Sequence, residues 1–317
     1  MSTKAINWNR IDDALDKAVW EKLTEQFWLD TRIPISNDLD DWRNLTDLER
    51  DIVSKVFGGL TLLDTLQSET GVKALIEDVS TQHEEAVYNN IMFMESVHAK
   101  SYSSIFSTLL TPTAIDEVFE WTNTNPQLRF KSDKIEYVYK NGTPLQKKAA
   151  SVLLESFLFY SGFYTPLWYL GNNKLPNIAE IIKLILRDEA SHGTYIGYKF
   201  QVQFNQLSED EQAEVQEWVY DFLYELYENE LVYSHDLYDE IGWYEDVRVF
   251  LEYNANKALM NLGLDVLFPT TGDDVNPIVM NGISTGTSNH DFFSQVGNGY
   301  LLGQVEAMSD NDYLIGT

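Results

Sequence analysis

Two of the five histidines in the chain follow a glutamate by three residues, in the pairs Glu95–His98 and Glu189–His192. Residues three apart on a helix share one face, so both members of a pair can reach the same metal ion. One such pair arises easily by chance, whereas two pairs on separate helices are a more specific signal. The spacing therefore predicts two helices that present oxygen and nitrogen ligands.

Two further carboxylates stand inside apolar stretches, where an unpaired charge is costly. Asp64 lies within residues 60–66, and Glu155 lies within residues 151–159. Taken singly, each has an ordinary explanation as a partly exposed carboxylate or as a member of a buried salt bridge. Together with the two glutamate–histidine pairs, they make the ligand set of a two-metal site inside a helical bundle.

The charge balance and the residue types narrow the choice of metal. Four carboxylates are balanced by two divalent cations, and neutral imidazoles add no charge, so an occupied site can lie in an apolar core. An empty site would suffer repulsion between like charges and should hold protons. The chain has no cysteine, which excludes thiolate ligands and disulfides. Oxygen and imidazole donors favour iron or manganese.

Tyr102 stands one helical turn beyond His98 and is expected on the same side of its helix. A core tyrosine usually packs and makes one hydrogen bond, but beside a redox-active metal pair a phenol is also a one-electron donor. Phe159, Phe163 and Ile185 fall at helical offsets from the ligand candidates. We expect these three side chains to enclose a dry pocket in which a phenoxyl radical survives.

Helical spacing of apolar residues recurs along most of the chain, and no alternating run is long enough to indicate a sheet. The segment Thr46-Asp47-Leu48-Glu49 has the pattern of a capping box. The sequence therefore predicts an all-α fold. The expected helices cover residues 11–27, 46–67, 72–110 (as one or two helices), 113–121, 144–169, 177–204, 208–230 and 231–262.

The chain has 317 residues, 44% of them hydrophobic, and a net charge of −28. That charge argues against binding to nucleic acid, and the absence of cysteine favours a cytoplasmic location. The N-terminus shows no secretory signal. The apolar residues 149–170 include Glu155 and Pro166, so we expect a buried helix there and no membrane span. We expect a helical domain over residues 1–267 and a tail over residues 268–317, whose composition is also compatible with passive disorder.

The order and spacing of these residues resemble the small, radical-generating subunit of class I ribonucleotide reductase, in its class Ib form. The resemblance covers residues 8–317. Its specific motifs are Asp64, the pattern E-x-x-H-x-x-x-Y from Glu95 to Tyr102, then Glu155, and the pattern D-E-A-x-H from Asp188 to His192. The resemblance implies a ferritin-like helical bundle with a dimetal-carboxylate site in its core.

Members of this family oxidise the tyrosine that matches Tyr102 to a stable radical and pass the radical to a large catalytic subunit, which reduces ribonucleotides. The resemblance implies two manganese or two iron ions per chain, a homodimer, and activation of the manganese form by a flavodoxin-like protein. It also assigns the metal ligands to Asp64, Glu95, His98, Glu155, Glu189 and His192.

Three further residues match positions of the family's radical-transfer path. Trp28 matches the relay tryptophan, and Asp188 matches the aspartate that links it to His98, although an aspartate bonded to a ligating imidazole can also be purely structural. Tyr300 matches a tail tyrosine that bridges to the large subunit, so the tail is expected to dock there. The chain ends in residues 310–317 without the closing aromatic of many relatives, and Tyr313 is its nearest substitute.

Two other classes of protein share the expected ligand set. The first is another ferritin-like dimetal enzyme, such as a monooxygenase, a desaturase or a ligand-binding oxidase. The second is a metal-binding or iron-storage bundle with no enzymatic activity. Neither class needs a relay tryptophan or a docking tail, so Trp28, Tyr102, Asp188 and the tail favour the radical-generating subunit.

Overall fold

The computed structural model describes residues 4–284, and all secondary structure in that range is helical. The prediction of an all-α fold is therefore confirmed. The metal-ligand candidates, Tyr102, Trp28 and Asp188 all lie inside the described range. Tyr300, Tyr313 and the rest of the expected tail beyond residue 284 lie outside it.

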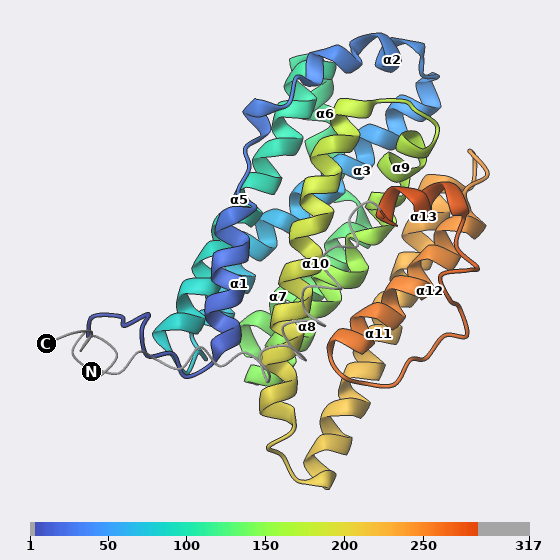
Figure 1. Cartoon of the computed structure of the whole chain (residues 1–317). Helices are drawn as coiled ribbons and strands as arrows, with labels where there is room; N and C mark the ends of the chain where they lie inside the picture. The colour runs from blue at the N-terminus through green and yellow to red at the C-terminus, as the bar shows by residue number, and fades with distance from the viewer. Residues whose placement is uncertain (1–3, 285–317) are drawn as a thin grey trace, which may run out of the picture.

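Four helical segments form the centre of the molecule (Figure 1). They are α3 (Asp47–Leu66), α5 (Gln82–Leu109), the continuous stretch of α8 (Pro144–Leu153), η4 (Leu154–Leu158) and α9 (Tyr160–Gly171), and α10 (Pro176–Phe204). Within this group, α3 packs against α5 and α9, while α10 packs against α5, α8 and α9. This four-membered bundle is the part of the fold that carries every expected metal ligand.

The other elements surround this bundle. Helix α1 (Ala14–Glu25) packs on α5, and α11 (Glu209–Tyr238) packs on α12 (Tyr244–Asn261). The remaining elements are η1 (Asp30–Arg32), η2 (Ile35–Asp38), α2 (Leu39–Asn44), η3 (Gln67–Gly71), α4 (Val72–Ile76), α6 (Pro112–Thr124), α7 (Pro126–Asn141) and α13 (Pro277–Ser284).

Local sequence signals start several of these helices. The capping box predicted before α3 is present, with the Thr46 side chain accepting from the Glu49 backbone and Glu49 accepting from the Thr46 backbone. Equivalent boxes precede α8 and α11. Proline occupies the first position of α6, α7, α8 and α10, where its missing N–H costs no hydrogen bond.

Apart from the short segments η1, η2 and α2, which were not predicted, the structure differs from the expected helices in three places. Helix α7 was not predicted, because its sequence is strongly polar and its buried face is narrow. The break expected at residues 230–231 is wrong, since α11 continues to Tyr238 and the chain turns at Gly242, which has φ of 78°. Residues 268–284, expected to begin the tail, include α13, which packs on α9 and buries Val279 completely.

Two short segments have the wider π-helical turn, in which each N–H reaches back five residues. They are η3 (Gln67–Gly71), directly after α3, and η4 (Leu154–Leu158), between α8 and α9. The second segment contains Glu155. Such turns are uncommon and are often found at functional sites.

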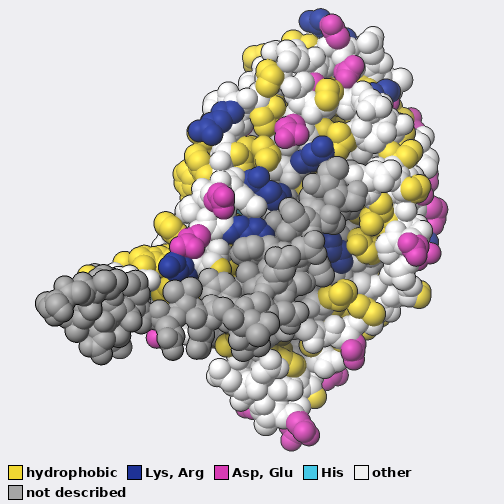
Figure 2. Space-filling model, in the orientation of Figure 1, with side chains coloured by type: hydrophobic (Ala, Val, Ile, Leu, Met, Phe, Trp, Pro, Cys, Tyr) yellow, Lys and Arg dark blue, Asp and Glu magenta, His cyan; other side chains and the backbone are white. Residues whose placement is uncertain are grey.

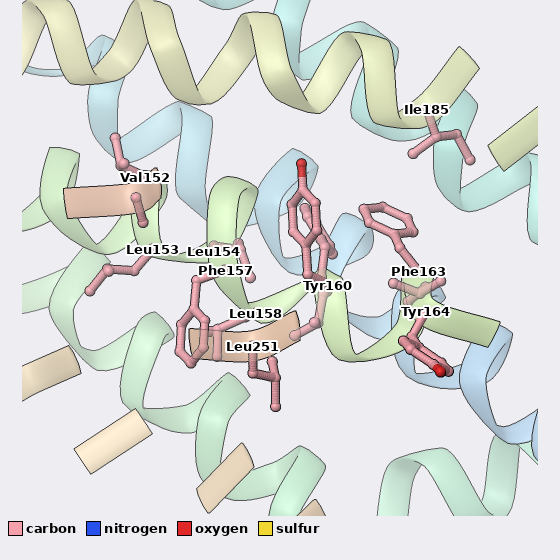
Figure 3. Close-up of a cluster of buried hydrophobic side chains, with 14 of the residues drawn as sticks. Val152, Leu153, Leu154, Phe157, Leu158, Tyr160, Phe163, Tyr164, Ile185 and Leu251 are labelled. Carbon is pink, nitrogen blue, oxygen red and sulfur yellow. The ribbon is translucent and has the colours of Figure 1, made fainter. Parts of the chain in front are cut away.

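The helices of the bundle pack around one continuous hydrophobic core. Figure 3 shows part of it around η4 and α9, where Phe163 and Ile185 belong to the same cluster of buried side chains. On the surface face drawn in Figure 2, acidic and basic side chains are interspersed with hydrophobic ones. Within residues 4–284, no helix is both long enough and apolar enough to cross a membrane.

Candidate metal centre

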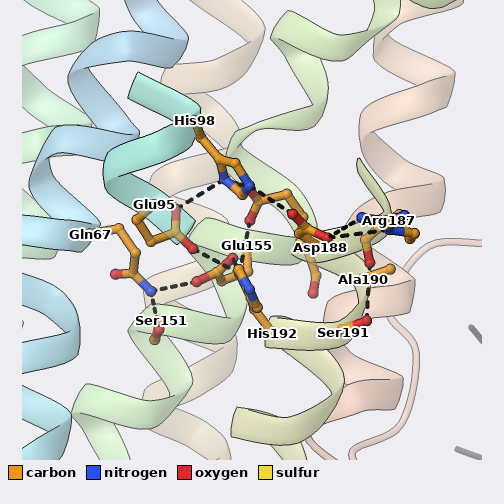
Figure 4. Close-up of polar contacts among 12 residues, drawn as sticks. Gln67, Glu95, His98, Ser151, Glu155, Arg187, Asp188, Ala190, Ser191 and His192 are labelled. Atoms are coloured by element: carbon orange, nitrogen blue, oxygen red, sulfur yellow. Dashed lines mark hydrogen bonds and ion pairs between the residues drawn. The ribbon is translucent and has the colours of Figure 1, made fainter. Parts of the chain in front are cut away.

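Six side chains from the central bundle converge on one buried position, and Figure 4 labels Glu95, His98, Glu155 and His192 among them. Asp64, Glu95, His98 and Glu189 offer ligand atoms that all lie within 4.8 Å of one another, and so do Glu95, Glu155, Glu189 and His192. Glu95 and Glu189 belong to both groups. Two overlapping groups that share two carboxylates could hold two adjacent cations.

Each histidine directs Nδ1 toward the carboxylates. His98 Nδ1 lies 2.9 Å from Glu189 Oε1 and 3.6 Å from Glu95 Oε2. His192 Nδ1 lies 2.8 Å from Glu95 Oε1 and 3.6 Å from Glu155 Oε2. The Nδ1 atoms are therefore the ones placed to bind metal, one in each group of four residues.

The polar atoms of this cluster fit a pair of cations because the protein alone leaves them without hydrogen bonds. Among the described residues, no hydrogen-bond partner reaches the carboxylate oxygens of Asp64, Glu95 and Glu189, nor Nδ1 of His98 and His192. All of these side chains are at most 1% exposed. Buried groups without partners are costly, and bound cations would satisfy all of them together.

The shifted pKa values of the clustered glutamates and histidines also indicate that the cluster requires positive charge. Burial, followed by repulsion from neighbouring carboxylates, raises the pKa of Glu189 well above its usual range. Burial alone would lower the pKa of His192, but the closely placed carboxylates of Glu155 and Glu95 outweigh it and raise that pKa to about 9. Burial opposes the charge of Glu95, yet the closely placed imidazoles of His192 and His98 lower its pKa to about 2. A metal-free cluster therefore holds protons, which bound cations would displace.

Tyr102 is fully buried, and its ring stacks on Phe57 with centroids 5.7 Å apart. Burial, and after it the negative charges of Asp64, Glu189 and Glu95, raise the pKa of the Tyr102 phenol well above its usual range. The phenol is therefore neutral at physiological pH. Its hydroxyl has no well-formed hydrogen bond within the described range.

A hydrogen-bonded chain leads from the cluster toward Trp28. Asp188 Oδ2 accepts a hydrogen bond from Trp28 Nε1 at 2.7 Å and lies 3.1 Å from His98 Nε2. Burial works against the charge of Asp188, but the His98 hydrogen bond outweighs it and lowers the pKa of Asp188. An ionised carboxylate can only accept, so His98 Nε2 carries the proton and Nδ1 is left with its lone pair for a metal.

The roles predicted for the remaining site residues stay predictions. Phe159, Phe163 and Ile185 are fully buried, and the rings of Phe159 and Phe163 are 5.8 Å apart; their role around a radical stays a prediction. Tyr300 lies outside the described residues. Arg187, which was not among the predicted site residues, donates from Nη2 to Asp188 Oδ1 at 3.2 Å.

The side chains that contact the ligand candidates and Tyr102 from the surrounding core were not predicted from the sequence. Gln67 donates to Glu155, Tyr139 donates to Gln67, and Phe57 is the aromatic neighbour of Tyr102. Gln67 lies three residues after Asp64, and a polar residue at that spacing is the one signal that points to it. No local pattern marks Tyr139, which lies on the unpredicted helix α7.

Comparison with known proteins identifies the family. Residues 5–277 match the family model described as ribonucleotide reductase, small chain. The chain belongs to this family. A small chain from Mycobacterium leprae (strain TN), the ribonucleoside-diphosphate reductase subunit beta, is 52% identical over 98% of this chain and 95% of its own length.

Other small chains are similar over nearly the whole sequence. The ribonucleoside-diphosphate reductase 2 subunit beta of Escherichia coli (strain K12) is 49% identical, over 98% of this chain and 97% of its own length. The crystal structure of dimanganese(II)-NrdF from Streptococcus sanguinis is 72% identical, with a TM-score of 0.88, and covers 89% of this chain and 100% of that chain. The ferritin-like fold expected from the resemblance is thereby confirmed.

Proposed function

We propose that this chain is the radical-generating small subunit of a class Ib ribonucleoside-diphosphate reductase, with Tyr102 as the residue that stores the radical. The observation that supports this most directly is the placement of a fully buried, neutral phenol beside a cluster of four carboxylates and two imidazoles. The expected ligands are Asp64, Glu95, His98, Glu155, Glu189 and His192.

The cofactor would be two manganese or two iron ions. Oxygen and imidazole donors suit both metals, and the 72% identical relative from Streptococcus sanguinis is described as dimanganese(II). When bound and activated by an oxygen-derived oxidant, the metal pair supplies one-electron oxidising power. Asp188 contributes by holding the Nε2 proton of His98, which leaves Nδ1 as the ligand atom.

Tyr102 supplies the electron. Because its pKa is raised far above neutrality, the phenol must release its proton together with the electron and so becomes a neutral phenoxyl radical. A neutral radical suits a site with no exposure to solvent, where a charged product would be costly. The buried side chains of Phe57, Phe159, Phe163 and Ile185 would keep water and reductants away.

Trp28 and Asp188 provide a route for the electron in the later transfer. The Trp28 ring stacks near that of His98, with centroids 5.9 Å apart, and both donate to the same oxygen of Asp188. This chain of contacts leads from the cluster to a tryptophan that is 5% exposed. Beyond Trp28, we propose Tyr300 and the tail as the connection to the large catalytic subunit.

The assembly would involve three kinds of contact. We propose a second copy of this chain in a homodimer, the large catalytic subunit, and a flavodoxin-like protein that activates the manganese form. The family assignment and the subunit names of the relatives support the first two. The flavodoxin-like activator follows only from the class Ib resemblance, and a cytoplasmic location rests on the absence of cysteine; both stay predictions.

The proposal can be tested by loading the purified chain with metal, activating it, and recording its EPR and absorption spectra. A radical-generating subunit should show an organic radical signal and a sharp near-visible band, and should support ribonucleotide reduction when the large subunit is added. A dimetal oxygenase or a storage bundle would lack both spectral features. Metal binding without any radical in the active preparation would reject the proposal.

A further inference from the structure

Behind the metal-ligand candidates lies a second, fully buried group of polar side chains centred on Gln67 (Figure 4). Gln67 Nε2 donates to Glu155 Oε1 at 2.5 Å and to Ser151 Oγ at 2.7 Å. Tyr139 donates its hydroxyl to Gln67 Oε1 at 2.7 Å. Both hydrogens of the Gln67 amide and its oxygen are therefore in use.

The chemistry of the partners decides which way the Gln67 amide points. A carboxylate that binds metal would have no proton to give, so the side of the amide that faces Glu155 must be the NH2 group. The carbonyl oxygen then faces Tyr139, which supplies the matching proton. Tyr139 thus prevents the amide from flipping, and the amide in turn occupies one particular oxygen of Glu155.

This arrangement leaves the two oxygens of Glu155 in different situations. Oε1 is held by Gln67, whereas Oε2 has no hydrogen-bond partner among the described residues and lies 3.6 Å from His192 Nδ1. Only Oε2 is therefore directed toward the position where the second group of ligands converges. Without Gln67, the carboxylate would be free to rotate about its own axis.

The backbone around Gln67 is shaped to make this contact. Gln67 and Glu155 lie in the two π-helical segments, η3 and η4, so the hydrogen bond joins the two irregular turns of the bundle. Gly71 closes η3, and a Cβ there would stand 2.1 Å from Gln67 Oε1 and 2.8 Å from Tyr139 Cε2. Only a residue without a side chain leaves room for the amide and the ring.

Tyr139 also separates this group from solvent. Its side chain is 1% exposed but forms part of the wall of a surface pocket of about 300 Å³, together with Glu69, Lys73 and Lys140. The phenol ring therefore lies between that pocket and Gln67. A polar network that is fully satisfied and closed to water holds its members in one geometry.

We propose that Gln67 is a positioning residue that presents Glu155 to metal through Oε2, and that Tyr139 acts through Gln67 by fixing its amide. This inference deepens the proposed function and rests on it, because it assumes that the cluster binds two metal ions. It concerns the ion held by Glu95, Glu155, Glu189 and His192. The ion held through Asp64 and His98 should depend on Gln67 much less.

The test is Mn(II) binding to the intact, metal-free chain, followed by the loss of the EPR signal of free Mn(II). Gln67→Met keeps the length of the side chain and removes its hydrogen bonds. We expect the Mn(II) ion held by the Glu155 group, here called the second equivalent, to bind about 10- to 100-fold more weakly, as is typical when a partner behind a metal ligand is lost. The first equivalent should change by less than about threefold, within the scatter expected for distant effects.

A matched control is Gln201→Met. Gln201 lies on α10 as His192 does and donates to Asn261 O at 2.8 Å, but nine residues place it roughly 13 Å further along the helix. This variant should bind both equivalents as the parent does. Thermal unfolding of each metal-free variant, followed by circular dichroism, checks that both retain the fold.

A double-mutant cycle tests the part assigned to Tyr139. Tyr139→Phe keeps the wall of the pocket and removes the hydroxyl, so it should weaken the second equivalent less than Gln67→Met does. If Tyr139 acts through Gln67, the double variant should bind no more weakly than Gln67→Met alone. Additive effects would contradict that coupling.

The outcomes separate this inference from the function on which it rests. If the parent chain binds two Mn(II) ions and Gln67→Met binds them equally well, the inference is wrong and the metal centre stands. Equal weakening of both equivalents would also overturn it, because that result indicates general damage to the cluster. If the parent binds no Mn(II), the metal centre itself is rejected, and the inference with it.

Discussion

Replacing Tyr102 with phenylalanine should separate the chemistry of this residue from its contribution to stability. The Tyr102 side chain is fully buried, and its hydroxyl has no well-formed hydrogen bond within residues 4–284. A buried polar group without a partner costs about 1–3 kcal/mol, and phenylalanine fills almost the same volume. Tyr102→Phe should therefore raise the free energy of unfolding of the metal-free chain by about 1–2 kcal/mol while abolishing nucleotide reduction.

Tyr88→Phe is the matched control for this experiment. Tyr88 is also fully buried, and its hydroxyl likewise lacks a hydrogen-bond partner in the described part of the chain. Its ring packs edge-on against Tyr195, 5.7 Å away between centroids. Its removal should bring a similar gain in stability, but the radical signal and the reductase activity should remain.

The assay combines three measurements on the parent and both variants. Chemical denaturation of the metal-free chains gives the change in unfolding free energy, EPR after metal loading gives the radical yield, and turnover with the large subunit gives the activity. A gain of 1 kcal/mol corresponds to a rise of about 2–4 °C in the unfolding midpoint of a large domain. Retained turnover in Tyr102→Phe would refute the radical assignment, and a loss of stability would refute the account of its hydroxyl.

Three further perturbations follow from the structure. Trp28→Phe removes the 2.7 Å hydrogen bond to Asp188 but keeps an aromatic ring. EPR should still detect the Tyr102 radical, while turnover should fall at least tenfold, since a hydrogen bond to a charged group is worth about 1.5–3 kcal/mol. Unchanged turnover would argue against a relay through Trp28. Burial, and then repulsion from Arg187, lower the pKa of Lys22 from 10.5 to about 8. The folded state therefore binds the proton of the Lys22 ammonium more weakly than the unfolded state does, and the charged form of Lys22 destabilises the fold below pH 8. The stability of the Lys22→Met variant relative to the parent should therefore be greater at pH 7 than at pH 9, and denaturation experiments in which that difference does not shrink with rising pH would contradict this. Deleting the residues after Val296 should leave the radical signal intact and remove turnover with the large subunit; a truncated chain that still turns over would rule out the docking role of the tail.

The ligand set could be predicted from sequence because its chemistry is local. Helical periodicity places Glu95 with His98 and Glu189 with His192 on shared faces, and a charge inside an apolar run, as at Glu155, needs a compensating partner. These constraints act within one turn of one helix. The convergence of the four segments then follows from the packing of their apolar faces.

The supporting residues could not be predicted in the same way. Gln67 and Tyr139 are brought to Glu155 by tertiary contacts between segments that lie 72 and 88 residues apart. The π-helical turns that contain Gln67 and Glu155 have no periodic signature, because the preceding and following helices continue in the same direction. Helix α7 was missed for a related reason, since a mostly polar surface hides its narrow buried face.

The break between α11 and α12 was predicted too early for a different physical reason. Residues 228–233 contain no glycine or proline, so no helix-ending residue supports the division at residues 230–231. The chain turns at Gly242 because the backbone there adopts a positive φ of 78°, which glycine accommodates without strain. A glycine followed by an aromatic run was the better signal for the end of the helix.

The most direct measurement is a crystal of the chain soaked in Mn(II), with data collected for anomalous scattering of manganese. The account predicts two peaks about 3.5–4 Å apart, the spacing typical of two-metal sites, with Glu95 and Glu189 between them and Tyr102 alongside. A single peak, or manganese bound away from these residues, would contradict it.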